Sequence, residues 1–391
     1  MSDKMRVLQI IHGFNMGGAE TLVKDYLLYL NANGVECRAL CFEEHKKSYI
    51  PLLRNAGISI VNIGELIPQC VKRMGIIGRP IWYAFAYTIF RREVNKWKPD
   101  VIHSHLEINR FVRFAVGGKP IKGSNERRTR LFHTVHSKPE LLWFEKDVSA
   151  RERQKQRIEF SATNALIQNQ GMRLIALHDR MKVELDELFE VNNTVVVKNG
   201  IDFKRFDNAK SSASMRNMLG IPKNAFVIGH VGRFSKQKNH NKILSVFKEI
   251  RKSRRDAFML LVGDGELKET IQDELQKNDL NGCSLILSNR EDVPDLMAAM
   301  DVFLFPSLNE GLGIVLIEAQ KMKLPCIISD TVPSSAIISN LVSVKKLEEE
   351  DSEWAKSVLK PYPSDIIYDH LEEWDMNNVI AHLLKLYRGE E

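Results

Sequence analysis

Two cations stand close together in a glycine-containing stretch near the middle of the chain. Arg233 and Lys238 occur in the segment GHVGRFSKQKN, which begins at Gly229. A planar guanidinium and a lysine ammonium at this spacing suit a diphosphate, because each can donate hydrogen bonds to phosphate oxygens. Surface cations with no ligand are the common alternative. The pair therefore indicates an anionic ligand only together with other features.

Two carboxylates follow in a second glycine-containing stretch, FPSLNEGLGI, which begins at Phe305. Glu310 precedes Gly311 and Gly313, and Glu318 stands eight positions after Glu310. Backbone N–H groups at the start of a helix attract phosphate. Carboxylates repel phosphate but accept hydrogen bonds from sugar hydroxyls. The combination predicts a ligand in which a sugar is joined to phosphate.

A third stretch, HGFNMGGAE, begins at His12 and contains the paired glycines Gly17 and Gly18. Paired glycines allow a ligand to approach the backbone closely, and a helix that starts behind them favours an anion. The spacing differs from the Gly-x-Gly-x-x-Gly pattern of dinucleotide-binding proteins, which argues against a nicotinamide or flavin enzyme. A tight turn without a ligand is the alternative.

The elements that must position these stretches follow from the alternation of short apolar runs with helical patterns. The first half of the chain predicts strands over 7–11, 37–42, 58–63, 101–105, 130–135, 165–168, 174–176 and 194–198, with helices over 19–31, 80–97 and 179–189. The second half predicts strands over 226–231, 258–262, 284–287, 302–305 and 326–329, with helices over 242–251, 293–299, 312–322 and directly after Gly265. Strands that alternate with helices form parallel sheets covered on both faces. Two such series in 391 residues predict two doubly wound α/β domains, whose ligands bind beyond the carboxyl ends of the strands.

Cysteine usage and hydropathy indicate a reducing, aqueous environment. The five cysteines are scattered and odd in number: Cys37, Cys41, Cys70, Cys283 and Cys326. We find no leader-like N-terminus and no apolar run long enough for a membrane span, so we expect a cytoplasmic protein. His103 and His105 alternate on a predicted strand, but no third ligand has metal-site spacing, so we expect no metal.

The charge is unevenly distributed along the chain. Residues 1–170 hold 27 Lys and Arg against 16 Asp and Glu, a net charge of +11, whereas the whole chain carries +6. A basic first half indicates an anionic partner or a merely solvated surface. A nucleic-acid binder is the less favoured option, because no nucleic-acid motif accompanies the charge.

Residues 70–98 mix cations with aromatic side chains. The cations are Lys72, Arg73, Arg79, Arg91, Arg92, Lys96 and Lys98, and the aromatics are Trp82, Tyr83, Phe85, Tyr87, Phe90 and Trp97. The basic area continues with Arg110, Arg113, Lys119, Lys122, Arg127, Arg128 and Arg130. This mixture is typical of an anionic membrane interface. An ordinary helix with its aromatics in the core fits the pattern equally well.

The motifs together resemble the retaining glycosyltransferases of family 4, in the bacterial capsule and exopolysaccharide branch. The segments that carry the resemblance are GFNMGGAETL, DVIHSHL, HTVHS, VKNGID, GHVGRFSKQKN, LVGDGEL, DVFLFPSLNEGLGIVLIEAQ and NLVSVKKLEEEDSEWAK. The resemblance implies the GT-B fold, in which two Rossmann-like domains face a central cleft. It implies an acceptor-side domain over 1–197, a sugar-nucleotide domain over 198–373, and a C-terminal helix over about 374–391 that packs back onto the first domain.

The resemblance also implies roles for individual residues. The residues at the reaction centre would be His136, near the donor sugar, with Arg233, Lys238 and Glu310. Arg233 and Lys238 would bind the diphosphate, and Glu310 would meet hydroxyls of the donor sugar. The remaining donor contacts would come from Gly17, Gly18, Gly311, Leu312, Gly313 and, at the ribose, Glu318.

The expected activity is transfer of a sugar from a UDP-linked donor to a saccharide acceptor that is linked to a lipid. No cofactor or metal is expected, because the cations replace the metal, and the enzyme would sit peripherally on the inner face of the cell membrane. A nucleotide-sugar 2-epimerase or another GT-B enzyme is the alternative. The chain departs from the family at Lys323, where Gly is usual, and at His178, where Ser is frequent.

Overall fold

The computed structural model describes residues 4–15, 17–43, 48–74, 77–117, 122–124 and 128–391. The chain divides into two compact units. Unit 1 comprises Met1–Gly200 with Met376–Glu391, and unit 2 comprises Ile201–Asp375. Lys119 and Arg127 of the basic area lie outside the described residues.

Unit 1 is built on a parallel sheet of seven strands in the order β3-β2-β1-β4-β5-β6-β7. The strands are β1 (Arg6–Ile10), β2 (Glu36–Cys41), β3 (Ser59–Asn62), β4 (Val101–His105), β5 (Arg130–Thr134), β6 (Arg173–Ala176) and β7 (Val195–Val196). The strand order reverses between β1 and β4, which are paired in parallel. Ligands of doubly wound sheets bind beyond the carboxyl ends of the strands at such a point.

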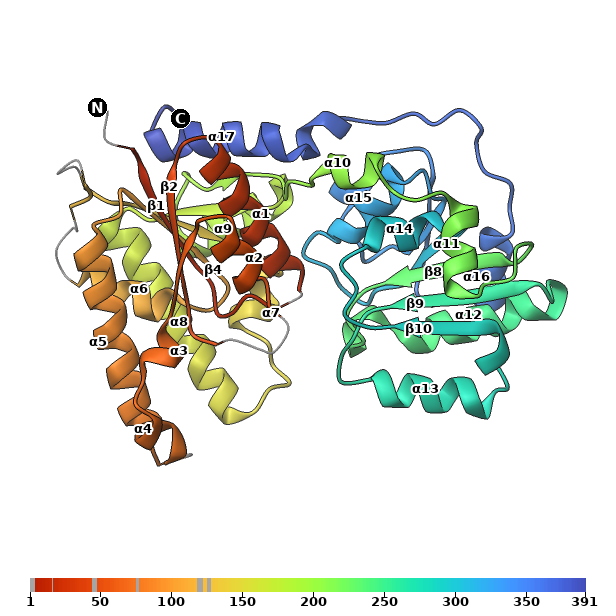
Figure 1. Ribbon diagram of the computed structural model, residues 1–391, viewed down its shortest axis with the longest axis horizontal. Coiled ribbons are helices and arrows are strands. Elements are labelled where there is room, and N and C mark those ends of the chain that lie inside the picture. The colour runs from red at the N-terminus through yellow and green to blue at the C-terminus, as the bar shows by residue number, and fades with distance from the viewer. Residues whose placement is uncertain (1–3, 16, 44–47, 75–76, 118–121, 125–127) are drawn as a thin grey trace. The chain divides into compact units, whose positions relative to one another are not determined.

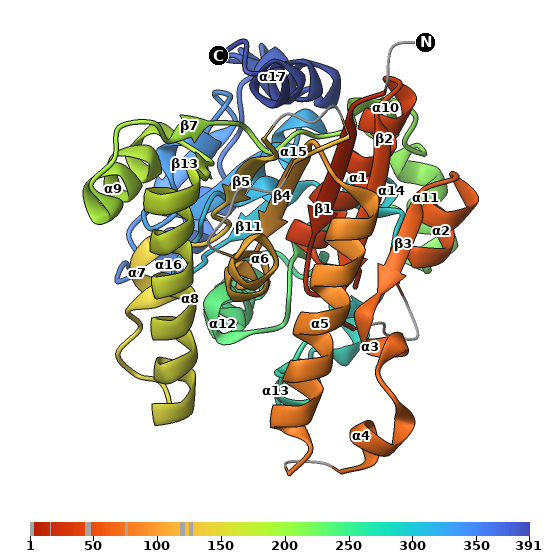
Figure 2. The same cartoon turned by 90° about the vertical axis from the view of Figure 1, so that its left-hand side faces the viewer.

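Helices cover both faces of this sheet (Figures 1 and 2). The helices are α1 (Gly18–Ala32), α2 (Ile50–Asn55), α3 (Ile63–Leu66), α4 (Gln69–Arg73), α5 (Arg79–Trp97), α6 (Asn109–Val116), α7 (Pro139–Trp143), α8 (Ala150–Gln170), α9 (Asp179–Phe189) and α17 (Met376–Arg388). Helices α5, α6 and α8 pack successively against one another, whereas α1 packs against α2 and α17.

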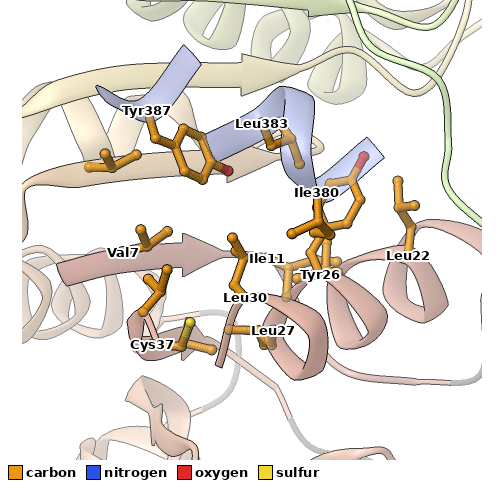
Figure 3. Packing of buried hydrophobic residues seen from close by; sticks show 14 of the residues in the cluster. Val7, Ile11, Leu22, Tyr26, Leu27, Leu30, Cys37, Ile380, Leu383 and Tyr387 are labelled. Carbon is orange, nitrogen blue, oxygen red and sulfur yellow. The ribbon is translucent and has the colours of Figure 1, made fainter. Parts of the chain in front are cut away.

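The C-terminal helix α17 belongs to the hydrophobic core of unit 1. Ile380, Leu383 and Tyr387 are at most 1% exposed and share a buried cluster with Val7 of β1 and Tyr26 of α1. Figure 3 shows these side chains between α17, β1 and α1. Residues separated by almost the whole length of the chain therefore form one core.

Unit 2 repeats the architecture with six parallel strands in the order β10-β9-β8-β11-β12-β13. The strands are β8 (Phe226–Val231), β9 (Ala257–Val262), β10 (Ser284–Leu287), β11 (Val302–Phe305), β12 (Cys326–Ser329) and β13 (Val342–Lys345). The helices are α10 (Phe203–Asp207), α11 (Ser212–Leu219), α12 (His240–Ser253), α13 (Lys268–Lys277), α14 (Val293–Ala298), α15 (Ile314–Lys321) and α16 (Asp351–Val358). The order reverses between β8 and β11, which are neighbours.

The strand predicted over 165–168 is wrong, because these residues lie inside helix α8 (Ala150–Gln170). The helix begins at an N-cap, in which the Ser149 hydroxyl accepts a hydrogen bond from the backbone N–H of Glu152. Its buried side includes Gln156, Glu159, Thr163 and Gln170. These polar residues interrupt the apolar periodicity, so only the short run near the end of the helix was visible in the sequence.

Candidate functional site

In unit 2, the loops after the neighbouring strands β8 and β11 are tied together by hydrogen bonds. The backbone N–H of Leu308 donates to the carbonyl of Gln237 over 2.8 Å, and the Gln237 side-chain amide donates to the carbonyl of Asn309 over 2.9 Å. The Asn239 amide donates to the carbonyl of Pro306 over 3.1 Å. Two stretches that are about 70 residues apart thus form one surface at the switch point of the sheet.

An ion pair joins the two loops at this surface. Lys238 Nζ lies 2.6 Å from Glu310 Oε1, and the side chains are only 13% and 7% exposed. The ammonium also lies 4.7 Å from the centre of the Phe305 ring. Two of the residues singled out from the sequence are therefore in contact.

Gln237 is a member of this site that sequence reasoning missed. Its side-chain amide also lies 3.4 Å from Glu310 Oε2, so Glu310 is held from two directions. The residue stands directly before Lys238 in a short 3₁₀ turn, Lys236–Lys238. Gln237 is uncharged, so only its position next to Lys238 in the sequence could have indicated a role in the site.

Arg233 lies on the solvent side of the same loop. Its guanidinium is 3.2 Å from Glu266, and the two side chains are 74% and 55% exposed. The loop itself is fixed by close packing, since a Cβ at Gly263 would lie 1.9 Å from the carbonyl oxygen of Gly232. The backbone of Arg233 is therefore fixed while its side chain forms an exposed ion pair with Glu266, whereas Lys238 is held in a nearly buried pair.

The N-terminus of α15 follows the ion pair directly. Gly313 caps the helix with φ 83°, a left-handed conformation that favours glycine. Leu312 is buried, and Glu318 is half-buried one helical turn further on. The N-cap of the helix therefore lies three residues after Glu310, and the N–H groups of the first turn favour a negative ligand.

The glycines after β1 lie beside a carboxylate. Gly17 precedes α1, and a Cβ built on Gly17 would lie 2.3 Å from Glu20 Oε2. The Glu20 carboxylate therefore folds back over the first turn of α1, where the helix dipole favours a negative group. A phosphate at Gly17 and Gly18 would have to share this position with Glu20 or displace it.

His136 follows strand β5 and contacts the end of strand β4. Its Nε2 lies 3.0 Å from Nδ1 of His105. Burial lowers the pKa of His136 to about 4, so the imidazole is neutral at pH 7. His136 is therefore suited to hydrogen bonding with a neutral group.

Both ring nitrogens of His103 and of His105 are engaged in hydrogen bonds to protein groups. His103 contacts Tyr387 and Thr134, and His105 contacts His136 and Gln9. Within the described part of the chain, no group of three or more His, Cys, Asp or Glu side chains is arranged to hold a metal ion.

The two departures from the family pattern have local explanations. Lys323 has φ 62°, the left-handed conformation that glycine would adopt, and Leu324 N–H donates to the carbonyl of Ala319 across the end of α15. His178 caps α9, because its Nδ1 accepts a hydrogen bond from the backbone N–H of Met181. A serine hydroxyl would perform the same capping.

The cations of α4 and α5 are exposed, but most aromatics of α5 are not free. Phe90 is 0% and Trp97 is 7% exposed, and Tyr87 packs on Phe111 with ring centres 4.6 Å apart. The exposed apolar groups are instead Ile77, Ile81 and Phe85, at 81%, 41% and 39%. Ile81 and Phe85 are four residues apart on the first turns of α5, and Ile77 lies just before the helix begins. No described helix is both long and apolar enough to span a membrane.

Two family models match the chain in succession. Residues 16–205 match the model described as Glycosyltransferase Family 4, and residues 211–359 match the model described as Glycosyl transferases group 1. The first match ends at residue 205, shortly after unit 2 begins at Ile201, and the second lies within unit 2.

Curated relatives extend over most of the chain. The putative glycosyltransferase EpsF of Bacillus subtilis is 26% identical over 92% of this chain and 88% of its own length. The UDP-Gal:alpha-D-GlcNAc-diphosphoundecaprenol alpha-1,3-galactosyltransferase of Escherichia coli is 29% identical over 70% of this chain and 68% of its own length.

Solved structures share the fold over nearly the full length. Anabaena HepE in complex with UDP and glucose superposes with a TM-score of 0.68 at 17% identity, over 98% of this chain and 95% of HepE. Sucrose-phosphate synthase of Thermosynechococcus elongatus superposes with a TM-score of 0.71 at 16% identity, over 99% of each chain.

Proposed function

The chain is a glycosyltransferase that belongs to family 4 and has the GT-B fold, and we propose that it acts in bacterial surface polysaccharide synthesis. In the proposed reaction a sugar moves from a UDP-linked donor to a lipid-linked saccharide, and the configuration at its anomeric carbon is retained. The observation that carries the proposal is the Lys238–Glu310 pair at the switch point of unit 2. A cation and a carboxylate in contact suit a ligand in which phosphate adjoins sugar hydroxyls. The name of the Escherichia coli relative, which acts on a UDP-linked donor and a lipid diphosphate, supports both substrate classes.

Lys238 and Arg233 act on the leaving group in this proposal. Cleavage of the bond between the sugar and the diphosphate places additional negative charge on the diphosphate. Lys238, Arg233 and the N–H groups at the start of α15 stabilise that charge, and a preorganised donor of this kind typically contributes about 3 kcal/mol. These groups supply the positive charge that a metal ion supplies in other transferases.

Glu310 and His136 act on the sugar, and Glu318 acts on the nucleoside. When the diphosphate engages Lys238, the Glu310 carboxylate is released to accept hydrogen bonds from sugar hydroxyls. The neutral His136 has the chemistry to form a hydrogen bond with a hydroxyl of the donor sugar, and Glu318 accepts from the ribose. The acceptor hydroxyl forms the new bond to the anomeric carbon, and the leaving phosphate oxygen takes its proton.

The acceptor belongs to unit 1, which carries the basic excess. We propose that α4 and the exposed side of α5 hold the enzyme against an anionic membrane, where a lipid-linked saccharide resides. The exposed Ile77, Ile81 and Phe85 provide apolar contacts, and the cations around them provide the charge attraction. Phe90 and Trp97 are buried, so these two aromatics take the core role that the sequence left open and are not part of this surface.

A donor panel tests the proposed reaction. Purified protein is incubated with UDP-, GDP- and dTDP-linked sugars, and the products are separated by chromatography, with and without EDTA. Release of UDP from a UDP-sugar, undiminished by EDTA, is the expected result. Conversion to an isomeric UDP-sugar would identify an epimerase instead, and activity that EDTA abolishes and magnesium restores would contradict the metal-free mechanism.

A further inference from the structure

A continuous series of hydrogen bonds runs from His136 into the core of unit 1. His136 Nε2 lies 3.0 Å from His105 Nδ1, and His105 Nε2 lies 2.8 Å from Gln9 Oε1. The Gln9 amide nitrogen in turn donates to the hydroxyl of Tyr387 over 3.3 Å. Since Tyr387 belongs to α17, the series connects the end of strand β5 to the C-terminal helix.

The series continues beyond Tyr387 in the same manner. The Tyr387 hydroxyl lies 2.6 Å from His103 Nδ1, and His103 Nε2 lies 2.7 Å from Thr134 Oγ1. We call the six side chains the histidine relay: His136, His105, Gln9, Tyr387, His103 and Thr134. All except the half-buried His136 are at most 1% exposed, so water does not compete for these hydrogen bonds.

The amide of Gln9 determines which atom donates and which accepts in each hydrogen bond of the histidine relay. An amide oxygen can only accept, so His105 carries its proton on Nε2. A neutral imidazole has one proton, so His105 Nδ1 must accept, and His136 must donate from Nε2. The other nitrogen of His136, Nδ1, is then bare.

The hydrogen bonds that start from the Gln9 amide nitrogen can be assigned in the same way. The amide N–H donates to the Tyr387 oxygen, so the hydrogen of Tyr387 is directed to His103 Nδ1. His103 Nε2 then donates to Thr134. Each hydrogen bond of the relay thus has one donor and one acceptor, and a reversed Gln9 amide would invert every one of them.

The members of the relay are neutral, as this assignment requires. Burial lowers the pKa of His103 and of His105 well below the ordinary value for histidine, and lowers that of His136 to about 4. Burial raises the pKa of Tyr387 well above its ordinary value. At pH 7 each imidazole therefore carries a single proton, and its tautomer is the only variable.

We propose that Gln9 and Tyr387 are positioning residues that fix His136 as the tautomer with hydrogen on Nε2 and a bare Nδ1. The C-terminal helix thereby sets whether His136 accepts or donates a hydrogen bond. The relevance for catalysis rests on the proposed function, in which His136 meets a hydroxyl of the donor sugar, and a bare Nδ1 accepts from that hydroxyl. The tautomer itself can be measured without any substrate.

Nitrogen NMR of the full chain tests this proposal. The protein is labelled with ¹⁵N-histidine, the His136 signals are assigned by their loss in His136→Gln, and the two ring nitrogens are compared. The wild type is expected to show a protonated Nε2 and a bare Nδ1. Tyr387→Phe and Gln9→Met are expected to give averaged shifts, because both tautomers of His136 become accessible.

Tyr26→Phe is the matched control. Tyr26 is as buried as Tyr387, and its ring stacks on His103 with centres 6.3 Å apart, but no described hydrogen bond joins it to the histidine relay. This variant should leave the His136 shifts unchanged. If Tyr387→Phe does not fold, Gln9→Met decides, because Gln9 lies on β1 and not on α17.

The activity of the same variants separates this proposal from the proposed function. Loss of a single neutral hydrogen bond predicts a kcat for UDP-sugar cleavage that is reduced about fivefold, with unchanged affinity for UDP. A wild-type proton on Nδ1 of His136, or an unchanged tautomer in both variants, would overturn the relay. Relay shifts as expected in a protein that cleaves no sugar nucleotide would support the relay and refute the proposed function.

Discussion

At the scale of single residues, the two carboxylates of the donor site have different surroundings. Glu310 pairs with Lys238 in a nearly buried position, whereas Glu318 lies half-buried on α15. We expect Glu318→Gln to weaken the binding of UDP and of the UDP-sugar alike, by about tenfold or more, because a hydrogen bond to a charged group contributes about 1.5–3 kcal/mol. Glu310→Gln should weaken binding of the UDP-sugar only, because the substitution leaves Lys238 free for the diphosphate.

Calorimetric titration of each variant with UDP and with the UDP-sugar measures the affinity for each ligand. Glu269→Gln, an exposed carboxylate on α13, serves as the control. Equal losses for both ligands in both variants would show that the two carboxylates do not divide the ligand in this way.

The sequence analysis singled out Lys238 and Glu310 but did not predict that they are in contact. Lys238 and Glu310 were visible because charges beside glycines are conspicuous, and the strand order places their loops side by side. Gln237, Gln9 and Tyr387 carry no charge, and two of them meet only because α17 returns to unit 1. The roles of such residues become visible only in the structure, because in the sequence a neutral side chain in a strand or helix is interpreted as part of the core.

At the scale of elements, most strands and the helices α1, α5 and α12 were predicted to within two residues, whereas β13 and the long helix α8 were missed. Buried parallel strands are short apolar runs between turns, and β4, β8, β10, β11 and β12 begin and end where the pattern indicated. Helix α8 was missed because polar residues form part of its buried side. Helix α15 ends as the family pattern requires, although lysine replaces glycine at position 323.

The conformation of Lys323 yields a stability prediction. A non-glycine residue with left-handed backbone angles costs about 1–2 kcal/mol, and Lys323 is exposed with φ 62°. We expect Lys323→Gly to raise the free energy of unfolding of unit 2 by about 1 kcal/mol, after the loss of chain entropy in glycine is included. Urea denaturation monitored by fluorescence provides the measurement.

The control for this prediction is another exposed lysine near a helix end. Lys277 is the last residue of α13 and has helical backbone angles, so Lys277→Gly should lower stability. A loss of stability in Lys323→Gly as well would mean that the side chain of Lys323 contributes more than its backbone strain removes.

At the scale of the whole molecule, charge is divided between the units in a way that favours membrane binding through unit 1. The cations of α4 and α5 are exposed, and each Lys or Arg near an anionic surface contributes about 1 kcal/mol. We expect the protein to bind vesicles that contain anionic lipid at low salt and to bind neutral vesicles poorly. Reversing Arg91 and Arg92 to Glu should weaken binding by at least about tenfold without altering cleavage of the UDP-sugar.

A matched pair of reversals in unit 2 controls for the change in net charge. Lys252 and Lys277 are 70% and 77% exposed, and their replacement by Glu should leave vesicle binding nearly unchanged. Sedimentation with vesicles at two salt concentrations gives the comparison. If the wild-type protein does not bind anionic vesicles at low salt, the proposed membrane-binding surface is refuted and a soluble acceptor is favoured.

The central claim is that the cations after β8 stabilise the departing diphosphate of a sugar nucleotide. Its most direct test is the turnover of the preferred UDP-sugar by Lys238→Ala and Arg233→Ala, with Lys236→Ala, an exposed lysine in the same turn, as the control. We predict that Lys238→Ala lowers kcat by about 100-fold or more and Arg233→Ala by at least about tenfold, while Lys236→Ala retains activity and all three variants remain folded by circular dichroism. Near-normal turnover in folded Lys238→Ala or in Arg233→Ala would contradict the account.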